Sequence, residues 1–142
     1  MTAYGVVGGV RGALQAALNV TAVTDLLYNQ SADSIAWLDA SGVGGRPYIL
    51  IELTSGGDEN ASPNRQREVV YTVKAVAATA EAAEQIDAQI DAQLHEGSLA
   101  ISGWQTVSVV REDDLAETQD DGGGGTDFVI GGQYRIRISQ TS

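Results

Sequence analysis

The fold is decided by a stretch near the C-terminus that reads Phe128-Val129-Ile130-Gly131-Gly132-Gln133-Tyr134-Arg135-Ile136-Arg137-Ile138. Apolar residues recur at every second position along one side of this stretch, and a period of two predicts a β-strand with one buried face. Its length would be about 36 Å at the usual rise per residue. Gly131 and Gly132 in the middle suggest a bulge or a bend.

Two segments upstream have the spacing of amphipathic helices. Apolar residues recur at helical spacing over 6–18, and again over 79–95. Thr79 is placed to cap the second helix and Gly97 to stop it. The buried stripe of that helix is predicted to consist of Ala83, Ile86, Ile90 and Leu94.

Three further strands are predicted, over 47–53, 67–77 and 104–110, where β-branched and apolar residues cluster. The sequence therefore predicts an α+β fold, a single domain over 1–142, with a mixed or antiparallel sheet of about four strands and two helices packed on one face. A right-handed crossover through the second helix would make strands 67–77 and 104–110 parallel. Flexible loops are expected at 54–66 and 112–127, as arms at opposite poles of the domain.

Composition excludes several classes of protein. The 142 residues include no cysteine and one histidine, His95, so disulfides, thiolate nucleophiles and multi-histidine metal sites are ruled out. The net charge of −11 has the wrong sign for gripping phosphate backbones. No apolar run approaches the roughly 18 residues of a membrane span, and the N-terminus lacks a secretory signal, so we expect a protein made in the cytoplasm with no membrane partner.

Twelve of the nineteen acids lie in two segments without a cation, 79–96 and 112–127. These segments could be solvated faces, a surface that repels DNA, or a docking face for a basic partner. A calcium site is the further alternative, but the required ladder of acids is missing. The candidate contact residues here are Glu84, Asp87, Asp91, Asp113, Asp114, Asp120 and Asp121.

Three cations form a second candidate set: Arg135 and Arg137 on the polar side of the last strand, and Lys74 on another strand. They are either ordinary solvent-facing residues or contacts with the acidic helix or loop of a neighbouring copy. Contacts between the cations of one copy and the acids of the next are head-to-tail, and they close into a ring when the rotation between neighbouring subunits permits. An enzyme that uses carboxylates alone for acid–base chemistry ranks last among the functions considered. We expect no catalytic residue, metal or cofactor.

The order of elements resembles the tail terminator, or tail completion, proteins of long-tailed phages and related viruses. The segments that carry the resemblance are the helix ending near Leu18, the strand entry Arg46-Pro47-Tyr48-Ile49-Leu50-Ile51, the strand 69–76, the helix 80–94 and the closing stretch 132–138. The likeness covers nearly the whole chain.

This resemblance implies a structural virion protein without enzymatic activity. It implies a ring, hexameric in the family, that caps the tail tube at its head-proximal end, ends tube polymerisation and joins the tail to the head connector. The implied partners are further copies of the chain, the tail tube protein and the connector or neck protein. DNA would pass through the ring without specific binding. The alternative is a stand-alone acidic module that binds calcium or a basic protein.

Overall fold

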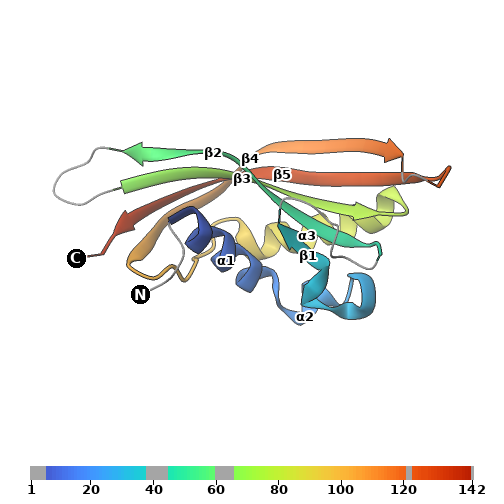
Figure 1. Ribbon diagram of the computed structural model, residues 1–142, viewed down its shortest axis with the longest axis horizontal. Helices are drawn as coiled ribbons and strands as arrows, with labels where there is room; N and C mark the ends of the chain where they lie inside the picture. The colour runs from blue at the N-terminus through green and yellow to red at the C-terminus, as the bar shows by residue number, and fades with distance from the viewer. Residues whose placement is uncertain (1–5, 38–44, 60–65, 121–122, 142) are drawn as a thin grey trace.

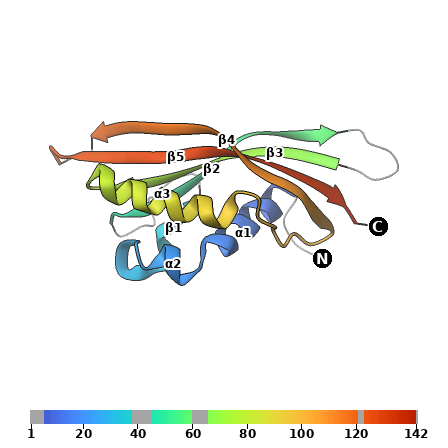
Figure 2. The ribbon, with the colours of Figure 1, turned by 180° about the vertical axis from the view of Figure 1, so that it is seen from behind.

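The computed structural model describes residues 6–37, 45–59, 66–120 and 123–141. Within these ranges the chain forms one five-stranded mixed sheet with its helices gathered on a single side (Figures 1 and 2). The other face of the sheet carries no helix in either view. The structure thus confirms the α+β class and the one-sided helical layer, and adds a strand to the predicted sheet.

Most of the helical elements precede the strands in the sequence. They are α1 (Val6–Leu18), α2 (Thr21–Thr24), the 3-10 turns η1 (Tyr28–Gln30) and η2 (Ala32–Ser34), and α3 (Ala80–Leu94). The strands are β1 (Ile35–Trp37), β2 (Tyr48–Glu59), β3 (Gln66–Ala77), β4 (Trp104–Asp120) and β5 (Thr126–Gln140).

The strands lie in the order β1-β2-β3-β5-β4. β1 runs parallel to β2, and the other three pairs are antiparallel. Since β3 and β4 both pair antiparallel with β5, they run in the same direction, as the predicted crossover requires, and β5 lies between them. β1 was not predicted, because its three residues are too short to show a period.

The predicted loops are wrong over much of their length, because β2 continues to Glu59 and β4 continues to Asp120. Residues 113–120 pair in register with β5. This pairing explains how so polar a stretch forms a strand, because β5 provides the backbone partners and the cross-strand neighbours. Residues 60–65 and 121–122 lie outside the described ranges. The two hairpins do point to opposite ends of the sheet, since Gln66 pairs with Ser139 and Asp120 with Thr126 (Figure 1).

Helix α3 confirms the predicted cap and stripe. The Thr79 hydroxyl accepts a hydrogen bond from the Ala82 N–H at 3.1 Å, and the buried residues are the four predicted ones. The left-handed residue after the helix is Glu96, at φ 59°, and not Gly97. Glycine is required at position 97 because the backbone passes close to the last turn of α3. A Cβ there would lie 2.8 Å from the carbonyl oxygen of Gln93.

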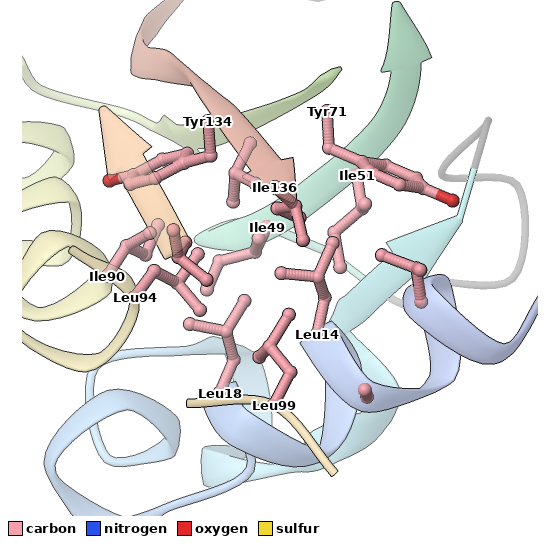
Figure 3. Packing of buried hydrophobic residues seen from close by; sticks show 14 of the residues in the cluster. Leu14, Leu18, Ile49, Ile51, Tyr71, Ile90, Leu94, Leu99, Tyr134 and Ile136 are labelled. Carbon is pink, nitrogen blue, oxygen red and sulfur yellow. The ribbon is translucent and has the colours of Figure 1, made fainter. Parts of the chain in front are cut away.

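The core lies between the helices and the sheet. Side chains from α1 and α3 meet those of β2, β3 and β5, with Tyr71 and Tyr134 among the largest fully buried residues (Figure 3). Burying each large apolar side chain contributes about 1.5–3 kcal/mol. In β5 the predicted alternation holds for Tyr134, Ile136 and Ile138. Nearer the start of β5 the buried residue is Val129, which belongs to the opposite side of the predicted alternation. It lies between Val76 and Glu117 on the face of the sheet away from the helices.

Tyr71 makes the stability of this core sensitive to alkaline pH. Its ring lies 5.7 Å from that of Trp37, and burial raises the pKa of Tyr71 from 10.0 to about 12, with Arg11 and Arg67 opposing the rise. The folded state therefore holds the phenolic proton more tightly than the unfolded state does. We expect the free energy of unfolding to be unaffected by Tyr71 below about pH 10 and to fall by about 2–3 kcal/mol between about pH 10 and 12.

Urea unfolding monitored by circular dichroism across this range tests the prediction. The variant Tyr71→Phe should show a shallower alkaline fall than the wild type. An identical fall in both proteins would show that Tyr71 does not carry the effect.

Candidate interaction surfaces

Arg111 in β4 is the centre of a hydrogen-bonded cluster that joins β4 and β5 to α3. Its two terminal nitrogens donate to the two carboxylate oxygens of Asp87 at 2.9 and 3.0 Å. The remaining donors reach the Tyr134 hydroxyl at 3.0 Å, the Gly131 carbonyl at 2.8 Å and, from Nε, Asp114 at 2.8 Å. All the N–H groups that a guanidinium can donate are therefore used. We call Arg111, Asp87, Asp91, Asp114 and Tyr134 the Arg111 cluster.

The two glycines of β5 make this cluster possible. A Cβ on Gly132 would lie 2.6 Å from Arg111 Nε, so any side chain there would displace the guanidinium. A Cβ on Gly131 would collide with the carbonyl of Val73 and lie 2.9 Å from the Cα of Lys74. The register of β5 with β3 is unbroken here, so of the predicted bulge or bend at the glycines the bulge is wrong. The irregularities lie in β4, between Thr106 and Ser108 and between Arg111 and Asp113.

The electrostatics of the cluster keep Arg111 charged. Burial lowers the pKa of Arg111, but hydrogen bonds to Asp87, Asp114 and Tyr134 outweigh burial and raise the pKa well above its ordinary value. Burial raises the pKa of Tyr134, with Arg111 opposing the rise, while its hydroxyl donates to Asp91 at 3.1 Å. Arg111 is thus charged and Tyr134 protonated at neutral pH, and the hydrogen bonds of the cluster fasten the edge strand to the helix.

The face of the sheet away from the helices carries a second network of charges. Lys74 contacts Glu52 at 2.7 Å and Glu117 at 3.9 Å. Arg135 pairs with Glu68 and Glu112, and Arg137 Nε donates to Glu68 at 3.1 Å. The three predicted cations therefore each have an acidic partner within the chain. Such partly exposed pairs contribute about 0–1 kcal/mol each, so they can exchange partners at low cost.

The predicted acidic residues do not form one surface. Asp87, Asp91 and Asp114 belong to the Arg111 cluster, and Asp114 is still 86% exposed. Glu84 is exposed on α3, and Asp113 and Asp120 are exposed on β4. Asp121 lies outside the described residues.

Sequence reasoning missed Arg111 and the pair formed by Arg46 and Asp127. Arg111 directly precedes the acidic run, which is the signal that could have marked it as the partner of those acids. Asp127 belongs to the acidic segment 112–127, but it is buried and pairs with Arg46, more than eighty residues earlier. The pKa of Tyr48 is raised by burial first and by Asp127 second.

Two features are absent from the residues that the structure describes. No helix there is both long enough and apolar enough to span a membrane. Within the same ranges, no three side chains of the His, Asp or Glu type converge closely enough to hold a metal ion.

Comparison with known proteins gives a fold and no family. No protein-family model and no curated protein matches the chain. A chain of the structure described as the virion of a native gene transfer agent particle aligns over 96% of this chain and 99% of its own length, with a TM-score of 0.69 and 15% identity. A second solved chain, whose name states no function, aligns over 95% and 96% with a TM-score of 0.60 and 17% identity. At these identities the likeness is one of fold.

Proposed function

We propose that the chain is a structural protein of a phage-like virion. The observation that carries this proposal is the end-to-end likeness to a chain of a gene transfer agent particle, which leaves almost none of either chain unmatched. The Arg111 cluster, in which one guanidinium makes five hydrogen bonds, supports the same reading. All the donors of its guanidinium are used within the chain, so the cluster suits a scaffold better than a reaction centre.

We further propose the tail terminator role: a ring of six copies that caps the tail tube at its head-proximal end, stops tube growth and joins the tail to the head connector. The geometry suits this role because the β2–β3 and β4–β5 hairpins lie at opposite ends of one sheet (Figure 1). One subunit could then contact the tube with one end and the connector with the other.

The charge suits a ring through which DNA passes. With a net charge of −11 and exposed acids on α3 and β4, the chain offers a polyanion few attractive contacts. DNA would slide past such a subunit without specific binding. The role requires no cofactor and no enzymatic step.

Light scattering coupled to size exclusion tests the ring. We expect a species of six times the 14.8 kDa monomer mass, which becomes more populated with concentration or on addition of tail tubes. A monomer under every condition, with no binding to tubes, would contradict the proposal.

Charge reversal on the helix-free face tests the subunit contact. Arg137 is the most exposed of the three candidate cations, at 52%, so Arg137→Glu should leave the fold intact and weaken assembly. The matched control is Asp33→Lys in η2, a charge reversal at an exposed acid that belongs to neither candidate contact set. Equal assembly of Arg137→Glu and the wild type would remove this face from the ring contact.

A further inference from the structure

The free edge of β4 is divided into a covered half and an open half. β4 is the last strand of the sheet, so only β5 pairs with it. After α3 the chain returns along its first half: the Glu96 N–H donates to the Val109 carbonyl at 2.8 Å, and the Arg111 N–H donates to His95 Nδ1 at 3.2 Å. Thr106 exchanges hydrogen bonds with the backbone of Leu99 at 2.9 and 3.0 Å. These contacts occupy the edge from residue 106 to 111.

Beyond the irregularity at Glu112, no such cover exists among the described residues. Residues 113–119 continue in regular register with β5, but no backbone hydrogen bond joins their outer side to another described segment. Every residue of this stretch is exposed except Leu115, which is half-buried. We call residues 113–119 the open edge. A regular, unpaired strand edge is a template for an added strand.

The charges of the chain argue against a second copy as the added strand. The open edge contains three acids, Asp113, Asp114 and Glu117, and no cation. At the opposite side of the sheet, β2 extends beyond Ile51, where the three-residue edge strand β1 ends, and residues 52–59 also contain three acids and no cation. Pairing of the open edge with the open edge, or with residues 52–59, of a second copy would place carboxylates beside carboxylates, which is destabilising.

We propose that the open edge binds an extended, basic segment of another protein, which adds to the sheet as a further strand beside β4. The acids lie on both faces of the edge: Glu117 is directed to the helix-free face, where it meets Lys74, and Asp114 is directed to the helical face, where it meets Arg111. The matching segment therefore carries arginine or lysine on both of its faces, with an apolar side chain beside Leu115. This inference goes beyond the proposed function and does not need the ring.

Hydrogen exchange with a model peptide tests the proposal on the full chain. The probe is a synthetic peptide of about ten residues in which pairs of arginines alternate with pairs of threonines, so that arginine lies on both faces of the added strand. At low salt we expect the peptide to slow amide exchange within 113–119 by about tenfold or more, and to leave α3 unchanged. A second peptide has the same arginines but proline in place of threonine, so it keeps the charge and cannot join a ladder. We expect it to bind at least about tenfold more weakly.

Two variants with equal charge change complete the experiment. Asp113→Lys combined with Glu117→Lys should abolish protection by the peptide, whereas Glu81→Lys combined with Glu84→Lys on α3 should preserve it. Equal binding of the proline peptide would show that charge alone attracts the probe, and this would overturn the proposal. Absence of protection at 113–119 would overturn the proposal too. The acids would then serve only to prevent the edges of two copies from pairing. Protection that rises with protein concentration and no peptide would instead identify a second copy as the occupant.

Discussion

Replacing Arg111 with alanine is expected to lower the free energy of unfolding by about 3 kcal/mol. The side chain is 14% exposed and Asp87 is 16% exposed, so its removal leaves a largely buried carboxylate without its bidentate partner. The hydroxyl of Tyr134 and the carbonyl of Gly131 lose a donor as well. Urea denaturation of the variant and the wild type measures the loss.

The matched control is Arg137→Ala, which removes an arginine from the next strand where its side chain is 52% exposed, and which should cost less than about 1 kcal/mol. In an Asp87→Ala background, Arg111→Ala should cost at least about 1 kcal/mol less than it does alone, because the pair is already broken. A loss below about 1 kcal/mol for Arg111→Ala alone would mean that the cluster does not fasten β4 to α3.

The substitution Gly131→Ala is expected to destabilise the protein by about 3 kcal/mol, through overpacking against backbone. The added methyl group would collide with the carbonyl of Val73, and neither atom can rotate away because both belong to paired strands. The β3–β5 ladder would have to open locally, and the carbonyl that accepts from Arg111 would move with it. Thermal and urea unfolding both report this change.

A glycine in open surroundings provides the control with the opposite sign. Gly12 lies within α1, and a Cβ there would meet nothing within 4 Å. Gly12→Ala should therefore stabilise the protein by up to about 1 kcal/mol, through helix propensity and the smaller entropy of the unfolded chain. If Gly131→Ala were as stable as the wild type, the close approach of β5 to β3 would be disproved.

The long segments with a periodic pattern were predictable, because each buries one face where the helices pack on the sheet and leaves the other face outside. The stripe of α3 and the alternation of β5 around Tyr134 both follow from the single helical layer on one face of the sheet. The second half of β4 was not predictable, since both of its faces are exposed and nothing selects apolar residues at alternate positions. Its strand conformation comes from pairing with β5, which is a non-local cause.

The Arg111 cluster was hidden from sequence reasoning for a related reason. Its members come from three elements, and the contacts of Arg111 with Asp87 and Gly131 join residues 24 and 20 positions apart. The glycine pair is plain in the sequence, but glycine in a strand signals either a bulge or a close approach. The position of Arg111 over Gly132, which only the structure shows, identifies the second alternative: the guanidinium lies close against the backbone of β5.

The proposed cap on the tail tube is tested most directly by the lengths of the tubes themselves. Electron microscopy of particles from the producing host, with and without the gene for this chain, measures both tube length and attachment to heads. The proposed role predicts tubes of variable, extended length and heads without tails when the chain is missing, with both defects restored by the wild-type gene. Tubes of normal length joined to heads in its absence would contradict it.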